Sequence, residues 1–417
     1  MNLYFEYRVV INYRKEPQEK VDFPAVTICN MNRMKSEFEI CIYDPSALEK
    51  CKPYQGDEII EGPLVRPEKR NFYFCNSQLG RESYTKINST TKFIEKYSEL
   101  ASQEREEYGH QLANLVEYCF FNGKSCNKNF HLLSSFQYGN CYTLNKLARL
   151  SLSAAETTQR EISKGLELVL NAEITQYVPI SQTVGFRIVI HDASEEPDPE
   201  TKGININPGY ETNILLRQTL TKRLPAPYKD HCVFYSNNKP FVGSQIQCMQ
   251  VCIQEYNYVK CGCTETLLSP SLSGRRQCNM KNSTDVCCLD SVLSHLAIHG
   301  TNCECPLPCV STYYNEISTR SMWPSKASFF QGKENATKED WINYRASHAK
   351  INIFFSTLEK AMYEQFPLFD KSEIFSHLGG ELGLWLGLSL AGLLESVELI
   401  LCFANSIIFI PIKVLSI

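Results

Sequence analysis

The 417-residue sequence has little net charge and lacks the local motifs that identify common enzymes. Its 42 basic and 46 acidic residues are interspersed, so no basic region typical of a nucleic-acid-binding protein stands out. The sequence contains no phosphate-binding loop, metalloprotease helix or nucleophile elbow, and its eight histidines are scattered. Internal repeats and long low-complexity linkers are absent as well. These absences argue against an enzyme, and we expect no nucleic-acid partner, no cofactor and no resident metal.

The N-terminal end lacks both a complete membrane span and an export signal. Residues 1–13 are aromatic and apolar but include Glu6 and Arg8, and they are too few to cross a bilayer. No charged region precedes a long apolar run with a small-residue cleavage site, so this is not a signal peptide. We therefore expect an upstream segment that supplies most of a first transmembrane helix.

Cysteine, in contrast, is abundant. A reduced cytosolic protein of this length would rarely carry 19 cysteines, whereas an oxidised extracellular domain uses them as crosslinks. Three glycosylation sequons fit the same compartment and lie at Asn88, Asn282 and Asn335. The composition therefore predicts a large, disulfide-rich extracellular domain.

Two hydrophobic periodicities alternate along the chain. Gly165 to Gln176 and Gly185 to His191 show the near-alternating aliphatic pattern of strands. Thr91 to Ala113 has helical spacing, and a second helix is expected from Asp290, which could cap its first turn, to Ile298. This mixture predicts an α+β fold.

The main apolar stretch, residues 378–415, lies near the C-terminus. Its charged residues are Glu381, Glu395, Glu398 and Lys413. Acidic residues in a lipid-spanning helix are costly unless they face a bundle interior or water, so we interpret the segment as a pore-lining helix. A plain C-terminal anchor with interfacial acids is the alternative.

Spacing suggests a ladder of disulfides in the second half of the chain. Cys248 and Cys252 would lie on one face of a helix, and Cys303 and Cys305 on one face of an extended segment. A helix laid against that segment could be stapled in nested order, with Cys232, Cys248 and Cys252 bonded to Cys309, Cys305 and Cys303. A zinc site is the alternative, but the two Cys-x-Cys pairs lack the usual two-residue gap.

Four features together resemble the degenerin, epithelial sodium channel and acid-sensing ion channel family. They are the Phe-Pro-Ala-Val-Thr-Ile-Cys-Asn motif at 23–30, the cysteine ladder, Trp-Pro-Ser-Lys-Ala at 323–327 and Leu-Gly-Gly-Glu-Leu-Gly-Leu-Trp at 378–385. The resemblance extends from Tyr7 to Glu398 and is poorest from Ser36 to Ser102. It implies a palm, β-ball, finger, knuckle and thumb, with three subunits around one pore.

The resemblance also implies boundaries and disulfides. Residues 1–16 would hold the end of the first transmembrane helix, 17–376 the extracellular domain, 377–410 the second transmembrane helix and 411–417 a short tail. The implied bridges are Cys29–Cys141, Cys119–Cys126, Cys232–Cys309, Cys248–Cys305, Cys252–Cys303, Cys261–Cys288 and Cys263–Cys278. Cys287 could replace Cys288, and Cys41, Cys51 and Cys75 are extra, with Cys41–Cys51 as a possible further loop.

Several roles follow from the resemblance alone. Gly387, Leu388 and Ser389 stand where the family has its selectivity filter, and Glu395 and Glu398 below them would attract cations. Alternatives are small-residue helix packing and interhelical hydrogen bonds. Ser376 occupies the gate position.

Further positions concern coupling and the stimulus. Tyr7 and Tyr228 resemble the aromatic pair that couples the first span to the thumb, although plain packing is the alternative. Glu195, Glu196 and Asp290 match an acidic pocket, but Ser294 replaces a second thumb acid. The stimulus therefore stays open among protons, peptides, force and constitutive activity.

We expect a subunit of a trimeric, amiloride-sensitive-type, sodium-selective cation channel in the plasma membrane. Its partners would be sodium ions, two further subunits and membrane lipid. The alternatives are a truncated, non-conducting subunit and a single-span, disulfide-rich receptor ectodomain.

Overall fold

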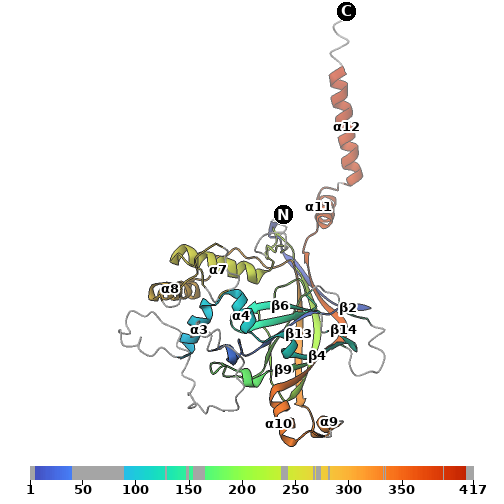
Figure 1. The fold of residues 1–417 in the computed structure, drawn as a ribbon. Coiled ribbons are helices and arrows are strands. Elements are labelled where there is room, and N and C mark those ends of the chain that lie inside the picture. The colour runs from blue at the N-terminus through green and yellow to red at the C-terminus, as the bar shows by residue number, and fades with distance from the viewer. Residues whose placement is uncertain are drawn as a thin grey trace, which may run out of the picture. The chain divides into compact units, whose positions relative to one another are not determined.

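The structure is a computed structural model in which the chain forms two compact units (Figure 1). The terminal unit comprises Met1–Asn12, Arg223–His231 and Glu364–Ile417, and the central unit comprises Tyr13–Lys222 and Cys232–Tyr363. The structure describes residues 5–39, 89–126, 129–146, 150–153, 165–235, 243–265, 268, 274–279, 282–331, 333, 335–387 and 389–409.

A seven-stranded sheet forms one layer of the fold. Its strand order is β13-β12-β14-β9-β4-β5, with β1 pairing with β14. These strands are β1 Val9–Pro17, β4 Val116–Phe121, β5 Lys124–Ser125, β9 Leu166–Asn171, β12 Tyr210–Lys222, β13 Val310–Met322 and β14 His348–Pro367. The long antiparallel pair of β12 and β13 keeps one register over 13 residues.

A five-stranded sheet forms the second layer, in the order β11-β10-β3-β7-β6. Its strands are β3 Ala25–Asn30, β6 Phe130–Ser135, β7 Gly139–Leu144, β10 Phe186–His191 and β11 Ile204–Ile206. All residues of β3 and β7 are buried, as expected of strands that are covered on both faces. A separate ladder pairs β2 Lys20–Asp22 with β8 Ser151–Ser153.

The main hydrophobic core joins the two sheets into a sandwich. Phe186 and Ile188 come from the five-stranded sheet, and Leu168, Ile351 and Ile353 from the seven-stranded one. Alternate residues of a strand point to the same face, so Ile351 and Ile353 both reach this core. The strand expected at 185–191 is present as β10, and the one expected at 165–176 is present as β9 but ends at Asn171, because Ile174–Gln176 form the short helix η4.

A smaller aromatic core lies under a group of short helices. These are η1 Ser36–Phe38, α3 Ser89–Glu99 and α4 Ser102–Tyr108, whereas α5 Leu112–Leu115 and η4 Ile174–Gln176 pack on the main core. The single helix expected from Thr91 to Ala113 is wrong, because Ala101 adopts an extended conformation between α3 and α4. Its backbone N–H donates to the Glu104 carboxylate over 2.7 Å, which starts a new helix there.

Two neighbouring helices, α7 Gln245–Cys261 and α8 Ser283–His299, form the disulfide-rich part of the central unit (Figure 1). Ser244 caps α7, and Asn282 caps α8 by accepting a hydrogen bond from the Thr284 backbone N–H over 3.0 Å. The predicted helix start at Asp290 is therefore wrong, because a better cap lies two turns earlier.

The remaining helices are α9 Lys326–Phe330, α10 Lys338–Ser347, α11 Lys371–Leu386 and α12 Leu390–Phe409. Within the described ranges, no helix combines enough length and apolar character to cross a membrane. The segment expected as one helix over 377–410 is instead divided, with α11 beginning earlier, at Lys371. The mixed α/β, disulfide-rich architecture agrees with the expected fold class.

Candidate pore and coupling site

Local backbone chemistry explains the break between α11 and α12. Gly387 ends α11 with a φ of 63°, a left-handed conformation that is strained for residues with a Cβ atom. Ser389 then caps α12, because its Oγ accepts a hydrogen bond from the Gly392 backbone N–H over 3.1 Å. Leu388 lies outside the described residues. The predicted filter residues Gly387 and Ser389 are thus the residues that interrupt the helix.

α12 carries negative charge and no basic residue. Glu395 and Glu398 are exposed and lie three positions apart, so their side chains project from adjacent turns. Ser396 is on the same helix, where its hydroxyl donates to the Gly392 carbonyl over 2.6 Å. Two carboxylates follow the helix break, and both are accessible in a single chain.

The predicted gate residue, Ser376, is exposed in α11. At the start of this helix the Asp370 backbone N–H donates to the Glu373 carboxylate over 3.2 Å, and the Glu373 backbone N–H donates to the Asp370 carbonyl over 3.1 Å. Ser372 donates its hydroxyl to the Asp370 carboxylate over 3.2 Å. These caps fix the first turn, and Ser376 stands on the next one.

Tyr7 and Tyr228, predicted to form a coupling pair, lie in contact in the terminal unit. Their ring centroids are 5.8 Å apart and the rings are nearly perpendicular, at 82°. Edge-to-face pairs of this kind contribute about 0.5–1.5 kcal/mol beyond area burial. Tyr7 adopts a φ of 48°, which is uncommon for an aromatic residue and is compatible with a backbone held by its surroundings.

Gln365, at the end of β14, connects segments of the terminal unit that the sequence did not show to be close together. Its side-chain amide donates to the Asp230 carboxylate over 2.6 Å and its carbonyl oxygen accepts from the Leu224 backbone N–H over 3.0 Å. A further backbone hydrogen bond joins the Leu368 N–H to the Arg8 carbonyl over 2.8 Å. Segments 5–8, 223–231 and 364–368 are therefore connected just before α11 begins.

The structure contains all seven of the disulfides that the family resemblance implied. They are Cys29–Cys141, Cys119–Cys126, Cys232–Cys309, Cys248–Cys305, Cys252–Cys303, Cys261–Cys288 and Cys263–Cys278. Sulfur atoms in disulfides cannot ligate zinc as thiolates, which removes the zinc alternative for the two Cys-x-Cys pairs. Cys287 is also disulfide-bonded, so it does not replace Cys288. The possible Cys41–Cys51 loop and Cys75 lie outside the described residues.

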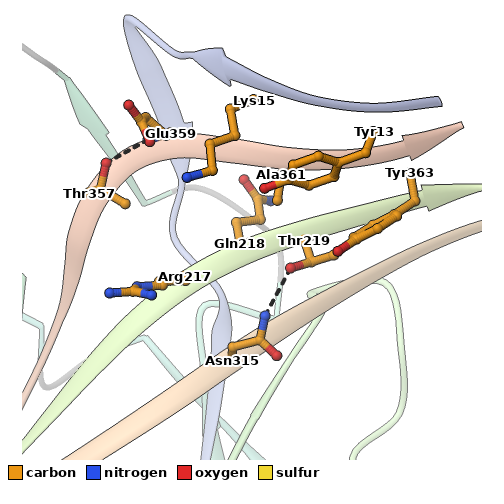
Figure 2. A pocket seen from close by; sticks show the side chains of 10 residues that line it. All are labelled: Tyr13, Lys15, Arg217, Gln218, Thr219, Asn315, Thr357, Glu359, Ala361 and Tyr363. Atoms are coloured by element: carbon orange, nitrogen blue, oxygen red, sulfur yellow. Dashed lines mark hydrogen bonds between the residues drawn. The ribbon is translucent and has the colours of Figure 1, made fainter.

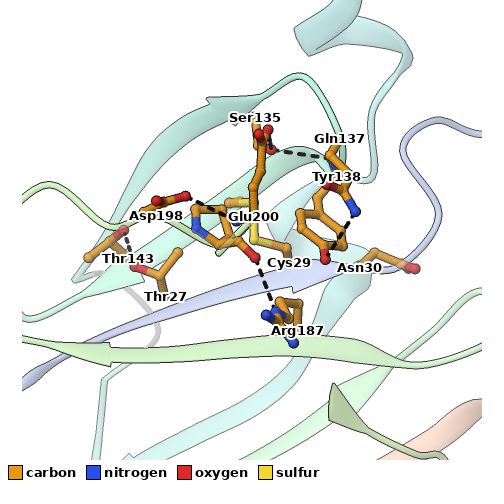
Figure 3. Close-up of a disulfide and its surroundings, with 12 residues drawn as sticks. Thr27, Cys29, Asn30, Ser135, Gln137, Tyr138, Thr143, Arg187, Asp198 and Glu200 are labelled. Carbon is orange, nitrogen blue, oxygen red and sulfur yellow. Dashed lines mark hydrogen bonds between the residues drawn. A yellow bond between two sulfur atoms is a disulfide. The ribbon is translucent and has the colours of Figure 1, made fainter. Parts of the chain in front are cut away.

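The Cys29–Cys141 bridge joins paired strands in the middle of the five-stranded sheet (Figure 3). Both residues are fully buried, and their Cα atoms lie 4.3 Å apart in the β3–β7 register. Two positions along the same ladder, Thr27 and Thr143 also face each other and share a hydrogen bond of 2.8 Å. The bridge is therefore part of the sheet rather than a surface staple.

The sequence model of the amiloride-sensitive sodium channel family matches residues 1–399, which include the sheets, the disulfides and the helix break. The chain belongs to this family.

Curated relatives come from both nematodes and vertebrates. Degenerin mec-10 of Caenorhabditis elegans is 30% identical over 370 residues, covering 86% of this chain and 50% of the relative. Epithelial sodium channel subunit alpha of Xenopus laevis is 25% identical over 464 residues, covering 96% of this chain and 73% of the relative. The subunit alpha of Gallus gallus is 31% identical over 314 residues, covering 70% and 47% respectively. The chain spans about half the length of the degenerins that it matches.

The carboxylates of the predicted acidic pocket have different electrostatic neighbours in this family member. Burial raises the pKa of Glu195, and Lys202 and Asp192 are the charges that act on it. Glu196 forms an ion pair of 2.7 Å with Lys146. Asp290 instead raises the pKa of Glu265, which burial already shifts upward.

Two predicted glycosylation sites are accessible. Asn282 and Asn335 are exposed, and each stands next to a helix N-terminus. Asn88 lies outside the described residues.

An open groove of about 370 Å³ lies on the seven-stranded sheet of the family fold (Figure 2). Lys15, Arg217 and Glu359 contribute its charges, and the Tyr13 and Tyr363 rings pack 5.0 Å apart at its edge. Thr219, Thr357 and Asn315 add polar side chains to its lining.

Proposed function

We propose that this chain is one subunit of a trimeric, sodium-selective cation channel in the plasma membrane. The observation that carries the proposal is the helix break at Gly387 and Ser389, within the segment that matches the sodium channel family. Non-helical backbone is tolerated at membrane depth only where it is buried in protein or lines water. A break made by these two small residues therefore fits a pore.

In this proposal three copies of residues 387–389 surround one axis. Gly387, Leu388 and Ser389 present backbone oxygens that replace part of the hydration shell of a sodium ion. Glu395 and Glu398 add negative potential and raise the local concentration of cations. The partners are sodium ions, two further subunits and membrane lipid around α11 and α12.

Gating is assigned to the terminal unit. The Tyr7–Tyr228 contact and the Gln365–Asp230 hydrogen bond transmit movement of segment 223–231 to α11. Ser376 is the residue whose small size permits closure. Replacing Ser376 with Trp is expected to raise the resting current of channels that reach the cell surface.

The decisive experiment compares the same substitution at two glycines. The full chain is expressed, and the sodium-to-potassium permeability ratio is measured for Gly387→Ala and for Gly380→Ala. Gly387 has a left-handed backbone, whereas Gly380 lies inside α11 with open space around it. We expect the ratio to change only for Gly387→Ala, since only that substitution strains the break.

Several results would contradict the pore assignment. One is equal selectivity in both variants, and another is lipid-only contact of thiols engineered at Leu388 and Ser389. Surface-expressed protein that gives no current and purifies as monomers would favour the receptor-ectodomain alternative.

External protons are one candidate stimulus for opening. The alternatives are peptides, mechanical force and constitutive opening without a stimulus. Glu195 favours protons, because its pKa is raised by burial and by Asp192, while Lys202 acts in the opposite direction. Lowering external pH from about 8 to about 5 crosses the range in which raised carboxylates titrate. A current that is evoked by this step and is smaller in Glu195→Gln would support proton gating. A wild-type current that does not change when the external pH is lowered would exclude it.

A further inference from the structure

One covalent bond of helix α8 is not explained by the seven bridges described above. Cys287 lies in the second turn of α8, is half-buried and is disulfide-bonded. The seven bridges contain every other disulfide-bonded cysteine that the structure describes. Cys402, in α12, is not disulfide-bonded. The cysteine bonded to Cys287 therefore lies outside the described residues.

The bond of Cys287 leaves α8 in a different direction from the bond of its neighbour. Successive residues of a helix project about 100° apart, so Cys287 and Cys288 face different sides of α8. Cys288 is bonded to Cys261, the last residue of α7, with the two Cα atoms 5.7 Å apart. Helix α8 is thus bonded to α7 at one position and to another part of the chain at the next.

The sequence leaves three candidates for this bond, Cys41, Cys51 and Cys75. Cys41 and Cys51 are ten positions apart, and Cys75 follows Cys51 by 24 positions. A short loop costs less entropy to close than a long one, which favours a bond between Cys41 and Cys51. Cys75 is then the cysteine that remains for Cys287. With this pairing no thiol is left in the predicted extracellular domain, as expected in an oxidising compartment.

We propose that a disulfide between Cys75 and Cys287 ties α8 to segment 40–88. It forms by thiol–disulfide exchange with a protein disulfide of the oxidising compartment, as the other seven bridges do. The two thiols lose two protons and two electrons, and the protein disulfide accepts them and becomes a dithiol. The bond joins positions that are 212 residues apart, against 112 for Cys29–Cys141. A longer closed loop restricts the unfolded chain more strongly.

The bridge also restrains the position of α8. Disulfide-bonded residues keep their Cα atoms within about 4.4–6.8 Å of each other. Asp290 stands three positions after Cys287, on the adjacent turn, and its charge acts on Glu265. The bond therefore holds the part of α8 that carries this carboxylate to segment 40–88, and movement between the two is limited to the reach of one disulfide.

Disulfide mapping of the purified full chain tests the proposal without any substitution. Thiols are alkylated, N-linked glycans are removed, and the unreduced chain is digested with trypsin. Cleavage after lysine and arginine places the three candidate cysteines in separate peptides, 36–50, 51–69 and 71–81. We expect peptide 71–81 to be bonded to the peptide that begins at Asn282, and peptide 36–50 to be bonded to peptide 51–69.

Serine variants identify the two partners by counting thiols. Cys75→Ser and Cys287→Ser should each expose one thiol more than the unmodified chain, as measured by maleimide labelling and intact mass. The double variant should expose no additional thiol, because it lacks both partners. The matched control is Cys41→Ser, which should expose the thiol of Cys51 and leave the bond between Cys75 and Cys287 in place.

Two results on the unmodified chain would overturn the proposal. Alkylation of Cys287 without reduction would show that the bond is absent. A crosslink from the Asn282 peptide to peptide 36–50 or 51–69 would show that Cys75 is not the partner. Neither measurement requires ion conduction, so failure here is distinct from failure of the channel proposal.

Discussion

In the sheet sandwich, side chains such as Phe186 and Leu168 are completely buried and pack into one continuous core. In helix α7, by contrast, the buried side chains are the polar residues Gln254 and Asn257. The Gln254 amide donates to the carbonyls of Leu268 and Glu265 over 2.6 and 2.8 Å, and its oxygen accepts from the Glu265 N–H.

We call α7, α8, the described residues between these two helices and segment 301–309 the thumb module. Five of the seven described bridges lie in it or join it to the rest of the central unit. A helix pair that buries few large apolar side chains gains little from the hydrophobic effect, and crosslinks compensate by restricting the unfolded chain. The same chain thus uses apolar burial in one region and covalent bonds in the other.

The largest effect is expected in the sheet sandwich. Phe186→Ala should lower the free energy of unfolding by about 3–5 kcal/mol, because it removes a fully buried ring and leaves a cavity. Chemical denaturation of the full chain measures the change. The control is Phe234→Ala, whose side chain is 74% exposed and should have little effect. Similar losses in both variants would show that this core does not dominate stability.

Removal of one thumb bridge should have the next largest effect. Cys248→Ala combined with Cys305→Ala opens a connection across 57 residues and should cost about 2–4 kcal/mol. Hydrogen exchange read by mass spectrometry should rise in α7 and α8 while the sheet peptides stay protected. The contrasting pair is Cys29→Ala with Cys141→Ala, which should raise exchange in the sheet. If each double variant raised hydrogen exchange equally in the thumb module and in the sheet, the two regions would not depend on separate bridges.

An ion pair in the thumb module between the buried Asp285 and the half-exposed Arg276 gives the third effect. Asp285 accepts from both terminal nitrogens of Arg276, at 2.7 and 3.1 Å, and from the Asn279 N–H. The Arg276 hydrogen bonds lower the pKa of Asp285 below its ordinary 3.8. This stabilisation is therefore present above about pH 3.8 and is lost as pH falls through the folded pKa.

Asp285→Asn should destabilise the module by about 1–3 kcal/mol, as expected for a buried partner of a charged group. It should also remove the acid dependence of exchange in α8. An unchanged acid dependence in the variant would contradict the assignment.

The smallest effect concerns a sheet carboxylate and has the opposite sign. Burial raises the pKa of Glu316, in β13, to about 7 from an ordinary value of 4.5. The folded state therefore keeps a proton that the unfolded state releases. The stabilisation is complete below about pH 4.5 and is lost as pH rises through 7.

Glu316→Gln should flatten the pH dependence of unfolding between these values, as measured by denaturation at a series of pH values. The effect is small because the side chain keeps partial contact with water. A wild-type profile that is already flat in this range would show that Glu316 titrates normally.

Sequence-based predictions were most accurate where the structure depends on residues that are close together in the sequence. Strands β9 and β10 were predictable because alternation of apolar residues is visible within six positions. The helix break between α11 and α12 is also a local feature, because Gly387 and Ser389 act on their own backbone, but the expected single helix over 377–410 missed it. The long helix at 91–113 was wrong because Ala101 leaves the helical conformation where α3 packs on a separate aromatic core.

Contacts between distant residues were not predictable from spacing alone. The hydrogen bond from Gln365 joins it to Asp230, 135 positions earlier, and no local pattern marks either residue. The stacking of Tyr256 in α7 on His295 in α8 spans 39 positions, and no local pattern marks this pair either.

By itself, the sequence determined that strands lie near residues 166–171 and 186–191, and that many cysteines required an oxidised domain. These properties depend on the backbone conformations and hydrogen bonds of neighbouring residues. The tertiary structure alone decided that Glu196 meets Lys146 while Asp290 acts on Glu265, and that Gln365 binds segment 223–231. Electrostatic and hydrogen-bond partners depend on distances of a few ångströms, which only the folded chain sets.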